Sequence, residues 1–171
     1  MKNVLPLIPP EMDNPFAKVN CMTLSEAEQT SLISLAITTL ELRHRPGQEL
    51  TSPDATRDYL RLCLGDRKNE VFGALFLDNK HRVICNEELF TGSISSASVY
   101  PRVVMQRVLE CNANALMLYH NHPSGDPEPS QADISITKRI TEVLQLIDVR
   151  VLDHFVVGSQ GSVAFTERGL L

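Results

Sequence analysis

The segment from His120 to Asp133 holds the residues of this chain that are best suited to chemistry. His120 and His122 are one residue apart, and Ser130 and Asp133 follow where a helix is expected to begin. Side chains two positions apart in an extended strand point to the same side, so the two imidazoles can meet at one ion. Two imidazoles and a carboxylate that leave one coordination position open are typical of a catalytic zinc centre. The segment therefore predicts a zinc ion bound by His120, His122 and Asp133.

The residues between His122 and Asp133 include others that could take part in the site. Asp126 and Glu128 lie in the loop, either as weaker ligand candidates or as solvated charges. Ser130 and Asp133 form a Ser-x-x-Asp pattern that caps a helix. The Ser130 hydroxyl could serve this cap alone or take part in the chemistry, and the sequence alone does not decide between the two roles.

The composition indicates one globular domain and excludes several classes of protein. The chain has 171 residues, 43% of them hydrophobic, and a net charge of −5. This charge argues against a general surface for polyanions. Without a signal peptide or a membrane-spanning run, we expect a cytoplasmic location and no membrane partner. The cysteines show no C-x-x-C spacing, so we expect reduced thiols and neither a cysteine zinc site nor a redox dithiol. They are Cys21, Cys63, Cys85 and Cys111.

Prolines and changes in hydrophobic periodicity divide the chain into three parts. Residues 1–22 contain four prolines and are expected to form an extended tail. Residues 23–65 are expected to form an N-terminal helical segment. Residues 66–171 alternate between strand and helix patterns and contain the predicted metal site.

Local signals place the individual elements. Thr23 and Glu26 suggest a capping box, Leu35 belongs to an apolar stripe of helical period, and Ser52-Pro53 suggests a second helix start. Strands are expected at 71–77, 82–90, 115–119, 149–157 and 162–165, the first two as a hairpin, and further helices at 101–112 and 130–146. The expected fold class is α/β (α+β), with a mixed β-sheet flanked by helices.

The spacing His120-x-His122, then Ser130 and Asp133, matches the metal-binding signature of the JAB/MPN metalloproteases, also called JAMM proteins. The surrounding motifs resemble the RadC branch of that family, most closely its short members from prophages and mobile elements. These motifs are Leu77-Asp78, Glu88-Leu89-Phe90-x-Gly92, Pro101-Arg102 and Asp153-His154. The likeness covers roughly residues 50 to 171. It implies a JAB/MPN (cytidine-deaminase-like) fold, with residues 66–171 as the RadC-like domain.

The resemblance also implies a function, that of a zinc-dependent metallopeptidase that cleaves a peptide or isopeptide bond in a protein or peptide substrate. The family uses an upstream glutamate that binds the attacking water, and Glu70 occupies the matching position. Glu87 and Glu88 on the next strand remain competitors for this role. Ser130 would then bind the oxyanion, and zinc would lower the pKa of the attacking water to about 7.

Two other functions are weighed against hydrolysis. The chain could be a metal-binding scaffold without turnover, or a RadC-type protein associated with DNA repair. Its net negative charge argues against direct nucleic-acid binding. Longer RadC proteins carry a helix-hairpin-helix region before this domain, and the first 65 residues here are too short for it. A zinc deaminase is excluded because no H-x-E with P-C-x-x-C occurs. We expect His154 to form a hydrogen-bonded structural pair with Asp153.

Overall fold

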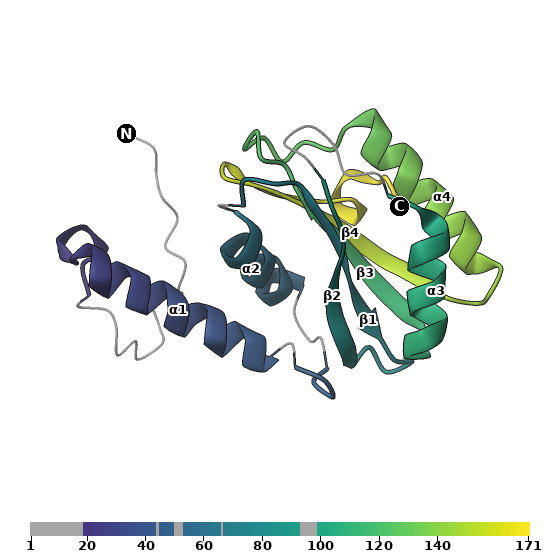
Figure 1. Ribbon diagram of the computed structural model, residues 1–171, viewed down its shortest axis with the longest axis horizontal. Coiled ribbons are helices and arrows are strands. Elements are labelled where there is room, and N and C mark those ends of the chain that lie inside the picture. Colours follow the sequence, from purple (N-terminus) through teal and green to yellow (C-terminus); the bar gives the residue numbers. More distant parts are fainter. Residues whose placement is uncertain (1–18, 44, 50–52, 66, 93–98) are drawn as a thin grey trace.

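The computed structural model describes residues 19–43, 45–49, 53–65, 67–92 and 99–171 (Figure 1). Its helices are η1 (Cys21–Thr23), α1 (Glu26–Arg43), α2 (Pro53–Leu64), α3 (Pro101–Cys111), α4 (Gln131–Gln145) and η2 (Thr166–Arg168). Its strands are β1 (Val71–Leu77), β2 (Val83–Thr91), β3 (Ala115–Asn121), β4 (Arg150–Gly158) and β5 (Gly161–Ala164).

A five-stranded mixed sheet forms the centre of the fold, in the order β2-β1-β3-β4-β5. β3 and β4 are parallel, and the other neighbouring pairs are antiparallel. Helix α2 covers one face of the sheet, and α3 and α4 cover the other (Figure 1). The predicted mixed sheet flanked by helices is therefore confirmed, and β3 lies at its centre.

Burial on both faces accounts for the sequence of β1. All seven of its residues are buried, as expected for an uninterrupted apolar run in a strand covered on both sides. β1 and β2 form the predicted hairpin. Its turn is held by the Asp78 carboxylate, which accepts hydrogen bonds from the backbone N–H groups of Lys80 (2.8 Å) and Arg82 (2.9 Å).

The N-terminal helices differ from their prediction in two respects. Helix α1 is capped by Ser25, whose hydroxyl accepts from the Glu28 N–H while the Glu28 carboxylate accepts from the Ser25 N–H. The predicted box of Thr23 and Glu26 is therefore wrong. The apolar stripe is also wrong at Leu35, which is 57% exposed, because α1 packs mainly on α2 and lies outside the sheet layers (Figure 1).

Pro53 is the first residue of α2, as expected, whereas Ser52 lies outside the described residues. Most of the predicted tail over residues 1–22 also lies outside them. Among the helices that the structure describes, none combines the length and apolarity that crossing a membrane requires.

Candidate metal centre

The central strand β3 carries the first histidine into the core. β3 extends two residues beyond its predicted end, so His120 lies within the strand and is only 1% exposed. The backbone N–H of His122 donates to the Val157 carbonyl (2.8 Å), which continues the contact with β4. His120 and His122 therefore point to the same side of the extended chain, as predicted.

The ligand atoms of His120, His122 and Asp133 converge. The two histidine Nε2 atoms are 2.9 Å apart. The Asp133 carboxylate lies 3.4 Å from each of them, with Oδ1 facing His120 and Oδ2 facing His122. Ligand atoms around a tetrahedral zinc ion with bonds of about 2.0–2.1 Å lie about 3.3 Å apart. The donor set and its spacing thus fit zinc.

The orientation of His122 is set by the main chain. Its Nδ1 lies 2.8 Å from the carbonyl oxygen of Asp126. A carbonyl can only accept, so Nδ1 carries the proton in this contact. In the neutral ring the Nε2 lone pair is then free and faces His120 and Asp133. Asp126 therefore contributes to the site through its backbone, whereas its carboxylate accepts from the Glu128 N–H (3.0 Å).

The loop between the ligands packs directly on the turn from β4 to β5. Gly125 adopts a left-handed φ of +91°, a conformation that favours glycine. Its carbonyl accepts from the N–H of Gln160 (3.0 Å). A Cβ atom at position 158 would overlap the Gly125 carbonyl group, so Gly158 permits this close backbone approach. The position of His122 thus depends on a contact between two glycines.

The substitution Gly158→Ala is expected to displace this loop. The added methyl group meets backbone atoms, which cannot turn away as a side chain can. Overpacking of this kind lowers the free energy of unfolding by about 1–3 kcal/mol. Urea unfolding of the metal-free protein measures this loss, and competition with a chelator measures the accompanying loss of zinc affinity.

The control for this experiment is Ser162→Ala on the neighbouring strand, a substitution that adds no atom beside the loop. It should leave both measurements close to the wild-type values. Wild-type stability and zinc affinity in Gly158→Ala would show that the contact with Gly125 does not hold the loop.

The close contacts among the three ligand side chains shift their pKa values. Burial by itself would raise the pKa of Asp133, but its contacts with the imidazoles of His120 and His122 hold that pKa well below its usual range. The pKa of His122 is raised, chiefly by its hydrogen bond to Asp133 and to a smaller extent by the charge of Glu70. The carboxylate is therefore ionised and ready to bind a cation.

Ser130 is the N-cap of α4 and forms a capping box with Asp133. Its hydroxyl oxygen accepts from the Asp133 N–H (3.2 Å), and its own N–H donates to Asp133 Oδ2 (2.7 Å). The cap uses a lone pair of the hydroxyl and not its proton. The cap role and the predicted oxyanion role are therefore compatible, because the second requires only the O–H donor.

The sheet places Glu70 beside the ligands. In the antiparallel pairing of β1 and β3, Phe72 lies opposite His120. Continuing this register for two residues brings Glu70 opposite His122. Glu70 is half-buried, and its charge contributes to the raised pKa of His122.

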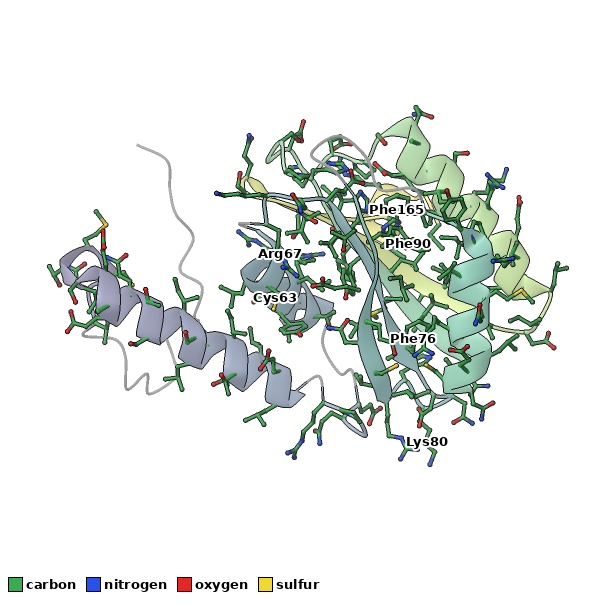
Figure 2. The ribbon with its side chains drawn as sticks, viewed as in Figure 1. Cys63, Arg67, Phe76, Lys80, Phe90 and Phe165 are labelled. Atoms are coloured by element: carbon green, nitrogen blue, oxygen red, sulfur yellow. The ribbon has the colours of Figure 1, made fainter. Side chains whose placement is uncertain are left out.

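The two competing glutamates are held elsewhere by ion pairs. Glu87 accepts from Arg107 on α3, with Oε2 2.9 Å from Nε. Glu88 forms an ion pair with Arg67, which follows α2 on the other side of the sheet (Figure 2). Of the three predicted candidates, Glu70 is the one whose charge is seen to act on a ligand, and the carboxylates of Glu87 and Glu88 are bound by arginines.

The Asn121 side chain connects the residues at the start of β1 to the end of β3. Its side-chain oxygen accepts from the Val71 N–H (2.7 Å), and its amide donates to the Asn69 carbonyl (3.1 Å). These bonds hold the residues on either side of Glu70. Sequence reasoning missed this role, because the partners of Asn121 are about fifty positions away and no local pattern marks them.

Asp153 and His154 are hydrogen-bonded to each other, as expected, but through the backbone N–H of His154 and not through its ring. The Asp153 carboxylate accepts from the hydroxyl of Thr166 (2.6 Å) and from the backbone N–H of His154 (2.8 Å). The His154 ring lies instead behind the site, with Nε2 2.8 Å from His120 Nδ1 and Nδ1 2.7 Å from the Thr137 hydroxyl. Burial is the main cause that lowers the pKa of His154 well below its usual range, so the ring is neutral.

A second group of potential ligands was missed because its members are distant in the sequence. The Sγ atoms of Cys85 and Cys111 lie 3.4 Å apart, next to Glu87. Arg107 already binds the Glu87 carboxylate. Burial is the main cause that raises the pKa of Cys85 to about 12. This group is therefore poorly suited to a metal at neutral pH, because the Cys85 thiol stays protonated.

The fold and the site define a mixed-sheet α/β domain with a candidate metal centre at the end of its central strand. A model of the RadC-like JAB domain matches residues 50–170. The chain therefore belongs to the RadC-like JAB domain family.

Curated relatives of this chain carry the name UPF0758 protein. The one from Photobacterium profundum is 53% identical over 145 residues, which cover 85% of this chain and 65% of the relative. The one from Vibrio parahaemolyticus is 58% identical over 123 residues, which cover 72% of this chain and 55% of the relative. The aligned region is thus less than two thirds of the length of these relatives.

Proposed function

We propose that this chain is a zinc-dependent amide hydrolase that cleaves a peptide or isopeptide bond. The observation that carries the proposal is the convergence of two histidine Nε2 atoms and the Asp133 carboxylate at distances suited to tetrahedral zinc. Membership of the RadC-like JAB family supports it. Three protein ligands leave a fourth position for water or substrate.

Access to the site supports a catalytic rather than a purely structural metal. The side chain of His120 is 1% exposed, whereas those of His122 and Asp133 are 18% and 15% exposed. One side of the cluster therefore faces the core and the other faces solvent. A substrate carbonyl and a water molecule can reach the ligands from the exposed side.

The residues around the cluster provide the remaining chemistry. Zinc bound there would supply a nucleophilic water at neutral pH and polarise the scissile carbonyl. The Glu70 carboxylate accepts the proton of the attacking water and passes it to the leaving amine. The Ser130 hydroxyl donates a hydrogen bond to the developing oxyanion. The products are a carboxylate and an amine.

Zinc-dependent release of amines tests this function. The protein, purified without chelators, should contain about one zinc ion per chain. Added to a heat-inactivated cell extract, it should generate new amines, which chemical labelling and mass spectrometry detect. Peptide cleavage creates new amino termini, and isopeptide cleavage frees lysine side chains. Removal of zinc should stop the reaction, and its return should restore it.

The same experiment separates hydrolysis from the alternatives. Protein without zinc after chelator-free purification would contradict the metal centre itself. One zinc ion per chain without any zinc-dependent new amine would favour a metal-binding scaffold.

A further inference from the structure

A buried chain of hydrogen bonds leads from helix α4 to the back of His120. The Thr137 hydroxyl oxygen lies 2.6 Å from the Asp133 carbonyl oxygen and 2.7 Å from His154 Nδ1. His154 Nε2 lies 2.8 Å from His120 Nδ1. Thr137, His154 and His120 are all at most 1% exposed. Burial of this kind excludes water as an alternative partner for these polar atoms.

The chemistry of these groups determines which atom donates and which accepts in each of these hydrogen bonds. Two oxygen atoms 2.6 Å apart must share a proton, and the carbonyl of Asp133 has none to offer. The single proton of the Thr137 hydroxyl therefore points at that carbonyl. Towards His154 the hydroxyl can only accept, so His154 Nδ1 carries a proton.

The protonated nitrogen of His154 in turn determines which nitrogen of His120 carries a proton. The ring of His154 is wholly buried and has no carboxylate among its hydrogen-bond partners, so the charged form is disfavoured. A neutral ring protonated on Nδ1 has a bare Nε2, which accepts the proton of His120 Nδ1. His120 Nε2 is thereby left unprotonated, facing His122 and Asp133.

We propose that Thr137 and His154 are positioning residues that hold His120 as its Nδ1–H tautomer, with the Nε2 lone pair directed at the metal site. The proposal rests on the zinc site proposed above. Partners that bind the distal N–H of a metal-ligating histidine fix its tautomer and ring orientation, and their loss lowers metal affinity about 10–100-fold. Here a second histidine, itself oriented by a threonine, takes the place that a carboxylate or carbonyl usually occupies.

Aromatic packing keeps the His154 ring in this orientation. The ring centroid of Phe165 lies 4.6 Å from that of His154, and the Phe72 centroid lies 5.4 Å away at an interplanar angle of 73°. Phe165, just after β5, points into the space between the sheet and α4 (Figure 2). The His154 ring thus contacts one aromatic ring from β1 and one from the segment after β5, and rotation of its imidazole would disturb both contacts.

The test compares Thr137→Val with Thr137→Ser. Valine keeps the shape of threonine but cannot accept from His154 Nδ1–H, whereas serine keeps the hydroxyl. Long-range ¹H–¹⁵N NMR spectra of the metal-free protein report the tautomer of each histidine directly. We expect His120 as the Nδ1–H form in the wild type and in Thr137→Ser, and partial conversion to the Nε2–H form in Thr137→Val. Zinc affinity, measured by chelator competition, should fall about 10–100-fold in Thr137→Val alone.

A matched control lies one turn further along α4. The Thr141 hydroxyl makes the same backbone contact, donating to the Thr137 carbonyl (2.9 Å), so Thr141→Val removes an equivalent bond. It should leave the tautomer of His120 and the zinc affinity unchanged. An equal loss of affinity in Thr141→Val would show that Thr137 acts through helix stability and would overturn the proposal.

A second variant keeps the proposal testable if Thr137→Val unfolds. His154→Phe retains an aromatic ring beside Phe72 and Phe165 but removes both nitrogens. It should give the same tautomer change and a similar loss of affinity. An Nε2–H form of His120 in the metal-free wild type would overturn the proposal. A wild type that binds no zinc but shows the Nδ1–H form would refute the proposed function and leave the hydrogen-bond direction supported.

Discussion

Replacement of His122 by alanine is expected to abolish zinc binding. The substitution removes one of three ligand atoms, which lies 2.9 Å from His120 Nε2 and 3.4 Å from Asp133 Oδ2. Loss of a partner behind a ligand already lowers affinity about 10–100-fold, so loss of the ligand itself should exceed that range. Elemental analysis of the purified variant measures the effect as zinc per chain.

The matched control for His122→Ala is Glu128→Gln in the same loop. Glu128 is one of the weaker ligand candidates, and its carboxylate pairs with Arg168 (2.8 Å) rather than with the ligand cluster. This variant should keep about one zinc ion per chain. Full zinc content in His122→Ala, or loss of zinc in Glu128→Gln, would place the metal elsewhere.

The second large effect is expected for Glu70→Gln, which should retain zinc and lose hydrolysis. Glutamine has nearly the same shape as glutamate, but its amide cannot take up the proton of the attacking water. General base catalysis typically contributes about 10²–10⁴-fold, and the rate should fall by this factor. The initial rate of amine release in the heat-inactivated extract measures the loss, with zinc content measured on the same sample.

Glu87→Gln and Glu88→Gln provide the comparison for Glu70→Gln. Both remove a negative charge from the strand that pairs with β1, but their carboxylates are paired with Arg107 and Arg67. Neither should slow the reaction. A normal rate in Glu70→Gln together with a slow rate in one of these variants would transfer the role of base to that glutamate.

Elements with strong local signals could be predicted from the sequence. The unbroken apolar run Val71–Leu77 is β1 residue for residue, because burial on both faces requires apolar side chains at every position. Pro101 begins α3 as expected, since proline suits the first helical position. The candidate ligands could also be predicted, because all three belong to the short segment from His120 to Asp133.

Ambiguous patterns produced the errors. The first helix offers two overlapping cap patterns, Thr23 with Glu26 and Ser25 with Glu28, and only the structure selects the second. The apolar stripe of α1 presumed contact with the core along the helix, whereas Leu40 packs against the core and Leu35 remains exposed.

The contacts behind His120 could not be predicted from the sequence. Thr137 and His154 are 17 positions apart, and His154 and His120 are 34 apart. Nothing about a threonine inside a helix or a histidine inside a strand indicates such a partner. Their roles depend on the parallel pairing of β3 with β4 and on the packing of α4 over that pair.

The two histidines of the site differ in how much sequence change they can survive. His122 is oriented by the main-chain carbonyl of residue 126, which every amino acid possesses. His120 is oriented through the side chains of Thr137 and His154, which few other residues can imitate. Many substitutions at position 126 should therefore be tolerated, provided that the backbone of the loop keeps its conformation. Few substitutions of Thr137 or His154 should be tolerated. The candidate metal centre is thus most sensitive to substitution among the buried residues behind His120.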